Sequence, residues 1–190
     1  APLLLRGALD DADPVVGAPM IYLEFLRPRF SLAAWARASP RAPWHVQAVA
    51  RQVLTGLFVL HSRNVVHGHV SPSTVVVLDG DRAQLAPPPL LAAWREWGGD
   101  ADEAADLAAF AAPEVERREV AGSCEADMFA FGAVLAWLNR ATKAEGHAVP
   151  RTGDDDLGRL VEALTDLDAS KRPSAADAAV PPYFQNSSMD

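Results

Sequence analysis

The chain has little cysteine, no excess of basic charge and no long hydrophobic run, and each shortage excludes a class of protein. It contains one cysteine, Cys124, which excludes an intrachain disulfide and a cysteine-rich metal site. A formal net charge of −8 leaves no basic surface of the kind that binds nucleic acid. No apolar run approaches the roughly 18–20 residues that a membrane-spanning helix needs. We therefore expect neither a nucleic-acid partner nor a membrane span.

What the chain does have is apolar content, which amounts to 49% of its 190 residues. This is typical of a globular protein with room for one sizeable core. The first six residues are interrupted by charge too soon for a signal peptide. Together with the single cysteine, this favours an intracellular location, although a cleaved leader would leave the compartment open.

The central stretch, residues 56–77, predicts a helix end, a polar loop and a short strand. Apolar residues recur every three or four positions over residues 43–62, which indicates a helix buried on more than one side. The loop then reads Val-Val-His-Gly-His-Val-Ser-Pro-Ser-Thr, and a β-branched run follows at residues 75–77. Residues 82–86 predict a second strand that pairs with the first across an Asp-Gly-Asp turn.

Other elements are predicted on either side of this stretch. Residues 2–8 and 20–25 read as two strands, and Ser31 is placed to cap a short helix through Trp35. An apolar helix follows Asp127, and residues 139–156 are polar and predict a loop. We then expect an amphipathic helix with Leu157, Leu160, Val161, Leu164 and Leu167 on its apolar face, and a last helix capped by Ser174 and Asp177.

Four motifs in sequence order resemble those of eukaryotic protein kinases. They are Leu60-His61-Ser62 before the loop, Ala112-Pro113-Glu114, Asp127-Met128-Phe129-Ala130-Phe131-Gly132 and Arg172-Pro173-Ser174. The resemblance covers about residues 20–184. The His-Gly-His sequence followed by Ser-Pro more weakly resembles the apicomplexan rhoptry kinase-like pseudokinases.

The resemblance implies an α+β fold that is mainly α. Residues 1–25 would be a remnant of the kinase N-lobe with a β hairpin and the hinge, residues 26–184 the helical C-lobe, and residues 185–190 a polar tail. The glycine-rich loop, strand lysine and acidic helix of the family are missing ahead of residue 1. Either the chain is a surviving large lobe, or upstream sequence is not included. The family's helix after the apolar one is expected to be shortened or deleted within residues 139–156.

The positions that resemble the family's catalytic residues hold other side chains. The catalytic Asp is replaced by His69, the Lys by Ser71 and the metal-binding Asn by Thr74. The Asp-Phe-Gly motif is replaced by Pro87-Pro88-Pro89, and proline offers no metal ligand. The resemblance therefore implies a degenerate pseudokinase that is not an enzyme, with no catalytic residue, no metal and no cofactor.

The remaining motif residues are expected to be structural. We expect His67 to hydrogen-bond within the loop and Asp127 to cap the loop's backbone from the start of a helix. Gly132 belongs to that central helix. In the family the closing arginine pairs with the Ala-Pro-Glu glutamate, which implies a buried ion pair between Glu114 and Arg172.

The expected function is that of a catalytically inactive scaffold, a protein-interaction subunit of a larger assembly. The missing N-lobe would leave apolar surface that a protein partner covers at residues 1–30, and the acidic loops indicate that this partner is partly basic. A first alternative is a nucleotide-binding regulatory switch, in which adenine meets the hinge backbone at Glu24, Phe25 and Leu26. A second is a divergent Ser/Thr kinase with residual phosphotransfer, in which His69 acts as the base.

Two other interpretations of the loop are weaker. Zinc bound to His67 and His69 would need further ligands, and no nearby Cys or Glu supplies them. A nucleophile–base pair of Ser71 and His69 would need an acidic partner and an oxyanion loop, and the spacing indicates neither.

Overall fold

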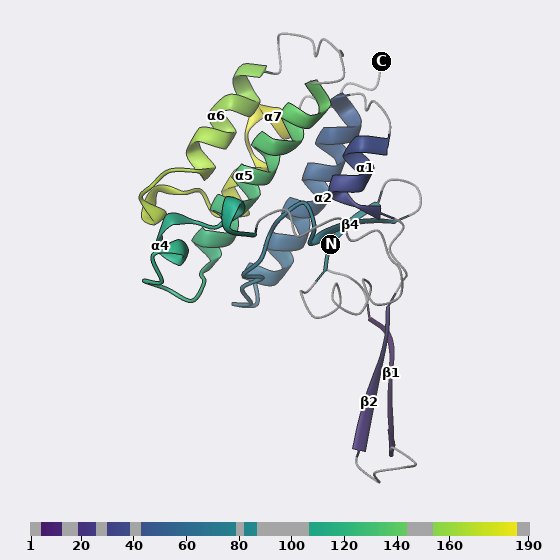
Figure 1. Ribbon diagram of the computed structural model, residues 1–190. Coiled ribbons are helices and arrows are strands. Elements are labelled where there is room, and N and C mark those ends of the chain that lie inside the picture. The colour runs from purple at the N-terminus through teal and green to yellow at the C-terminus, as the bar shows by residue number, and fades with distance from the viewer. Residues whose placement is uncertain are drawn as a thin grey trace.

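Two long helices form the centre of the structure, which is a computed structural model (Figure 1). They are α2 (Pro43–His61) and α5 (Cys124–Lys143). The structure describes residues 5–12, 19–25, 30–38, 43–78, 82–86, 107–143 and 154–185, and every structural statement concerns these ranges. None of their helices is long and apolar enough to span a bilayer.

The other helical elements are shorter and pack around this pair. They are α1 (Leu32–Ala38), α4 (Pro113–Glu116), α6 (Asp154–Leu164) and α7 (Pro182–Gln185), with 3-10 turns η1 (Leu107–Phe110), η2 (Ala169–Lys171) and η3 (Asp177–Ala179). In Figure 1, α6 lies alongside α5, and α2 lies on the other side of α5.

The strands form two separate antiparallel sheets. β3 (Phe30–Ser31), β4 (Val75–Leu78) and β5 (Arg82–Leu85) make a sheet in that order, with Phe30 opposite Val77 and Val75 opposite Leu85. β1 (Leu5–Ala12) and β2 (Pro19–Phe25) pair as a ribbon that projects from the helical body in Figure 1. The fold is therefore mainly helical with small antiparallel sheets, in agreement with the predicted α+β class.

The core forms where the apolar stripes of these elements meet. The stripe of α2 is buried through Val46, Val49, Val53 and Leu57, and β4 is buried along its whole length. The α2 side chain of Gln52 accepts a hydrogen bond from the backbone of Ala83 in β5 at 3.0 Å, which fixes the helix on the sheet. The buried residues of α1, α5, α6 and the last turns complete one cluster: Leu32, Trp35, Met128, Phe131, Leu135, Leu138, Leu157, Leu160, Leu164 and Phe184.

Several predicted boundaries are wrong. Residues 139–156 do not form a loop throughout, because α5 continues to Lys143 and α6 begins at Asp154; residues 144–153 lie outside the described ranges. Leu167 is not on the α6 stripe but lies beyond the helix end and is 77% exposed. Ser174 and Asp177 do bond to each other, at 2.6 Å, but they begin the 3-10 turn η3, and the last helix, α7, starts later, at Pro182.

The division into a hairpin remnant, a C-lobe and a tail stays a prediction. Residues 26–29, where the first boundary falls, and residues 186–190 of the expected tail lie outside the described ranges.

Gly132 is placed where α5 and α6 approach each other closely. A Cβ atom at this position would lie 2.7 Å from Leu164 Cβ and 2.9 Å from Thr165 Cγ2. The first of these neighbours is attached directly to the backbone of α6, so it cannot rotate away. The close contact of the two helices therefore requires glycine at position 132.

Replacement of this glycine should separate the two helices. We expect Gly132→Ala to lower the free energy of unfolding by about 1–3 kcal/mol, because the added methyl group overpacks the contact. Gly158→Ala is the matched control, since a Cβ there meets nothing within 4 Å. It should raise stability by about 0.5–1 kcal/mol, because alanine favours the helix more than glycine does. Urea unfolding followed by circular dichroism measures both, and equal effects would contradict the packing argument.

Candidate functional site

The candidate site is built on the loop between α2 and β4, residues 62–74. α2 ends in a turn in which the Val65 amide donates to Leu60 O at 3.0 Å and Asn64 adopts a left-handed φ of 55°. Asparagine tolerates this conformation better than most residues. The turn sends residues 65–70 back across the N-terminal end of α5, where Asp127 meets them.

Asp127 binds this loop through both of its carboxylate oxygens. Its Oδ2 accepts from the His67 amide at 2.8 Å and contacts His61 Nε2 at 2.9 Å, and its Oδ1 accepts from the Gly68 amide at 2.8 Å. The carboxylate is buried in the first turn of α5, where the helix dipole stabilises a negative charge. One buried charge thus joins the end of α2, the loop and α5.

The backbone at Gly68 explains the residue found there. Its φ is +78°, in the region that side chains with a Cβ rarely adopt. The amides of His67 and Gly68 both donate to the Asp127 carboxylate just before this turn of the backbone. Glycine is therefore favoured at position 68, next to the Asp127 contact.

His67 bridges the loop to the end of β5. Its Nε2 lies 3.2 Å from Ala86 O and its Nδ1 accepts from the His69 amide at 3.4 Å. Burial lowers the pKa of His67 below its ordinary value, although the Asp127 charge and the Ala86 carbonyl oppose this shift. A neutral ring that donates from Nε2 and accepts at Nδ1 satisfies both contacts.

The three hydroxyl side chains at Ser71, Ser73 and Thr74 are buried and bonded to one another or to the loop. Thr74 Oγ1 donates to His69 O at 2.6 Å and accepts from the Ser71 amide at 2.8 Å. The Ser71 and Ser73 hydroxyls lie 2.9 Å apart. The side chains at the positions that resemble the family's Lys and Asn therefore hold the loop together.

These donors do not fit a magnesium site. The Thr74 hydroxyl is already committed within the loop. In the parts of the chain that the structure describes, no group of three or more His, Cys, Asp or Glu side chains could hold a metal ion.

An apolar hollow of about 260 Å³ opens beside the loop. Its lining comes from the loop, from the segment that leads into α4 and from α5: Gly68, His69, Val70, Phe110, Ala111, Ala112, Val115, Glu116, Gly122, Ala126, Asp127 and Ala130. His69 is exposed at this hollow, and the exposed side chains of Val65, Val66 and Val120 lie on the two loops that border it. The two loops approach each other at Gly122, where an added Cβ atom would lie 3.6 Å from Val66 Cγ1. We call this region the catalytic-loop face, because its loop resembles the one that carries the catalytic residues in protein kinases.

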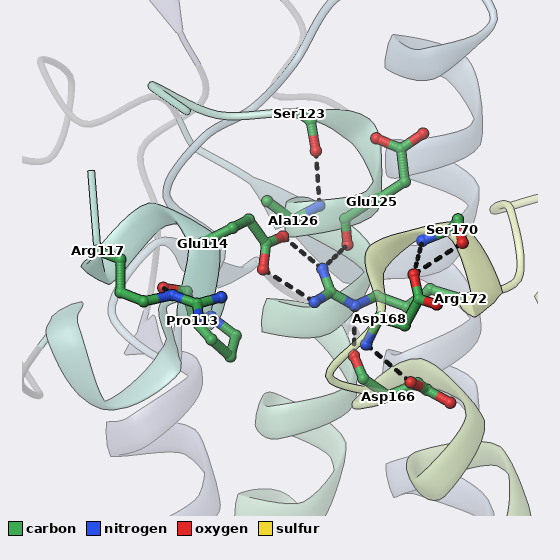
Figure 2. A network of polar contacts seen from close by, with 10 residues as sticks. All are labelled: Pro113, Glu114, Arg117, Ser123, Glu125, Ala126, Asp166, Asp168, Ser170 and Arg172. Atoms are coloured by element: carbon green, nitrogen blue, oxygen red, sulfur yellow. Dashed lines mark hydrogen bonds and ion pairs between the residues drawn. The ribbon is translucent and has the colours of Figure 1, made fainter. Parts of the chain in front are cut away.

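Arg172 is the second buried charge of the site, and Figure 2 shows its guanidinium group between three segments. It donates to Glu114 through two bonds, from Nη1 to Oε1 at 2.6 Å and from Nη2 to Oε2 at 2.9 Å. It also donates to Asp166 O at 2.8 Å and to Glu125 O at 3.1 Å, so four of its five N–H donors are hydrogen-bonded (Figure 2). The Arg172 side chain is 0% exposed and that of Glu114 12%. The ion pair expected between these residues is thus present, with the glutamate at the edge of the core.

The structure brings some predicted site residues together and separates others. His67, His69, Ser71 and Thr74 share the loop that Asp127 binds. Gly132 lies further along α5 and faces α6 instead. Of the hinge positions, Glu24 and Phe25 end β2, while Leu26 lies outside the described residues, as do Pro87, Pro88 and Pro89.

His61 is the site residue that the sequence analysis missed. Its ring contacts Asp127 from the last turn of α2, whereas only backbone contacts of Asp127 were expected. The Leu60-His61-Ser62 motif carried the signal, because an otherwise apolar helix ends there in a side chain with two ring nitrogens.

Removal of the Asp127 carboxylate should release the loop. We expect Asp127→Ala to cost about 3 kcal/mol of stability, since it leaves buried donors without a partner. Asp127→Asn keeps one acceptor oxygen and should cost less. Hydrogen exchange measured by mass spectrometry checks this, with faster exchange of the His67 and Gly68 amides expected in the alanine variant. Unchanged exchange across the loop would contradict the proposed link.

The Glu114–Arg172 pair should make stability depend on pH. The hydrogen bond from Arg172 holds the pKa of Glu114 below its ordinary value of 4.5. Because the pKa is lowered in the fold, the contribution is present above pH 4.5 and lost as pH falls through the lowered pKa. We expect Glu114→Gln to cost about 3 kcal/mol near neutral pH. The difference from the unchanged chain should narrow in acid.

Glu119→Gln is the matched control for this prediction, because it makes the same change in the exposed pair of Arg117 and Glu119, 3.2 Å apart. It should cost less than about 1 kcal/mol at any pH. Denaturant unfolding at a series of pH values compares the variants. A Glu114→Gln cost that stays constant as the pH falls below 4 would contradict the role of the ionised pair.

Comparison with known proteins gives a distant similarity to a protein kinase. A scan against protein-family models finds no match. The chain is 26% identical over 166 residues to the serine/threonine-protein kinase PDK1 of Cryptococcus neoformans, which covers 72% of this chain. The chain spans 13% of the length of that relative. The similarity supports a distant protein kinase-like relation.

This similarity contradicts the prediction that the chain is not an enzyme. The relative is named as a protein kinase, and the likeness to it shows no loss of activity. The replacements at His69, Ser71, Thr74 and Pro87 were the ground for that prediction, and they do not establish it. The distant similarity to a protein kinase is therefore the statement that the comparison supports.

Proposed function

We propose that this chain is a protein kinase-like domain, degenerate in its catalytic loop, which binds a protein partner through the catalytic-loop face. Residues 26–184 would form its C-lobe, residues 1–25 a remnant of the N-lobe and hinge, and residues 185–190 a tail. The hollow of about 260 Å³ carries the proposal, because it is mostly apolar and bordered by exposed valines.

The chemistry of the hollow indicates what kind of group it receives. Its floor is made of small and apolar side chains, among them Val70, Ala112 and Ala130. A pocket of this size and composition suits one aliphatic or small aromatic side chain of a partner. Exposed valines at positions 65, 66 and 120 extend the apolar area around it, and such patches mark interaction surfaces.

The arrangement of the loop favours recognition because the face is held in one shape. Asp127 fixes its backbone, and the buried hydroxyls fix its turn. A preorganised surface loses less conformational entropy when a partner binds. A role as subunit of a larger assembly, with further contacts over residues 1–30, agrees with this interpretation.

A second function, phosphotransfer to a protein, is favoured by the similarity to a named serine/threonine kinase. His69 stands at the position that resembles the catalytic Asp, is exposed, and lines the same hollow. An imidazole there could accept the proton of a substrate hydroxyl near neutral pH.

Peptides selected by phage display against the 190-residue chain test the first function. Val66→Asp should weaken their binding by about tenfold or more, because it places a charge in the apolar contact area. Leu167→Asp is the control, since Leu167 is also exposed and apolar but lines none of this hollow. Isothermal titration calorimetry gives the affinities. Peptides that bind both variants equally would place the binding surface elsewhere.

Transfer of radiolabelled phosphate from ATP to a generic acceptor protein tests the second function. Label transfer that His69→Ala abolishes, in a variant that unfolds like the unchanged chain, would support phosphotransfer. Transfer that survives this substitution would sink the assignment of His69 as the base.

A further inference from the structure

A second apolar surface lies on the outer side of α2, away from the residues that line the catalytic-loop face. Two hollows meet there, one of about 330 Å³ between α2, the start of α5 and residues 172–176, and one of about 410 Å³ between α2 and residues 175–184. Phe58, Ala175 and Ala176 line both hollows. The two therefore form one groove with Phe58 at its middle, which we call the Phe58 groove.

Phe58 is 48% exposed, whereas Phe184, the other phenylalanine that lines this groove, is buried. It points away from the stripe of α2 that packs in the core, since its helix neighbour Leu57 is fully buried. Half-exposed aromatic side chains with a hollow on each side have the shape of an interface anchor. The groove floor around it is lined by small side chains, Ala175, Ala176 and Ala179.

The two ends of the groove carry opposite charges. Arg51 lines one end, where its guanidinium carbon lies 5.9 Å from the centre of the Phe184 ring. Glu125 lines the other end and is exposed. Arg51 precedes Phe58 by seven residues on α2, which places it about 10 Å away along the helix axis. Arg172 also lines the Glu125 end, but its buried guanidinium group is paired with Glu114. The exposed charge of the groove is therefore positive at one end and negative at the other.

We propose that the Phe58 groove binds a second copy of this chain. A surface with opposite charges at its ends and an apolar centre is complementary to itself when the second copy is turned end to end. The two Phe58 side chains then lie on either side of the two-fold axis, and each enters a hollow of the other copy. Arg51 of each copy faces Glu125 of the other, so the charge match occurs twice.

This dimer uses residues other than those of the catalytic-loop face. Glu125 and Asp127 both lie in the first turn of α5, but Glu125 lines the Phe58 groove and Asp127 the catalytic-loop hollow. The proposal is therefore independent of the proposed function. A dimer leaves the catalytic-loop face open for its own partner.

Sedimentation equilibrium of the 190-residue chain over a wide range of concentrations measures the self-association. We expect a monomer–dimer equilibrium, and Phe58→Asp should raise its dissociation constant by about thirtyfold or more, since it charges the central anchor. Leu167→Asp, which changes an exposed leucine outside the groove, should leave the constant unchanged. Circular dichroism and thermal unfolding show that each variant is folded.

Charge reversal tests the end-to-end arrangement. Arg51→Glu alone and Glu125→Arg alone should each raise the dissociation constant by about tenfold, because each creates like-charge contacts at both ends. An equimolar mixture of the two variants should form a mixed dimer of nearly unchanged affinity, since every contact again joins opposite charges. The double variant should dimerise with itself for the same reason.

The outcomes are decisive either way. A chain that stays monomeric at every concentration would overturn the proposal and leave the groove to another partner. A dimer that Phe58→Asp leaves unchanged would also overturn it, and a mixture that does not recover affinity would refute the two-fold arrangement. None of these results bears on peptide binding at the catalytic-loop face, which Val66→Asp tests separately.

Discussion

The structure depends on how it satisfies two buried charges, and the carboxylate of Asp127 is the first of them. Three donors from two segments, at 2.8–2.9 Å, surround it, while the first turn of α5 adds the favourable end of a helix dipole. A buried charge is costly unless it is paired, so this arrangement fixes α2, the loop and α5 together. Arg172 repeats the principle with the opposite sign, since Glu114 and two backbone carbonyls take up its guanidinium. Both contacts lie at the start of α5. This helix therefore fixes the positions of the other segments of the site.

The part of the loop that Asp127 binds depends little on side chains, whereas its second half is held by the hydroxyls of Ser71 and Thr74. Asp127 binds backbone amides, which every residue but proline provides, and the positive φ at position 68 favours glycine there. Ser71 and Thr74 fill their positions with hydroxyls that turn inward and bond within the loop. The loop can keep its backbone conformation when its side chains change. For the same reason, a preserved conformation does not show whether the chain is catalytically active. That is why the replaced residues alone led to a wrong conclusion about the enzyme, which the similarity to a kinase then corrected.

Patterns of local origin could be predicted, and features set by tertiary contacts could not. The apolar period of α2 and the β-branched run of β4 gave those elements nearly at their observed ends. The Glu114–Arg172 pair followed from the family resemblance. The polar residues Asn139 and Arg140 suggested a loop, yet they continue α5 because a partly exposed helix end accepts them. Leu167 fits the period of α6, but the helix stops at Leu164 and the Asp168 side chain begins another turn. The ring of His61 could not be placed on Asp127, because 66 positions separate the two residues.

The buried residues that hold the fold and the exposed residues of the two surfaces differ in how freely they can be replaced. Phe58, Val66 and Val120 are exposed and contribute little to the core, so their replacement costs little stability. Asp127 and Arg172 are buried and tolerate almost no change, because loss of either leaves buried polar groups without partners. Selection can therefore alter the two surfaces independently while the arrangement of helices stays the same. The first turn of α5 illustrates the point, since one exposed carboxylate at Glu125 faces a groove and one buried carboxylate at Asp127 holds the fold. The two proposed binding surfaces of this chain thus consist of residues that folding leaves free to vary.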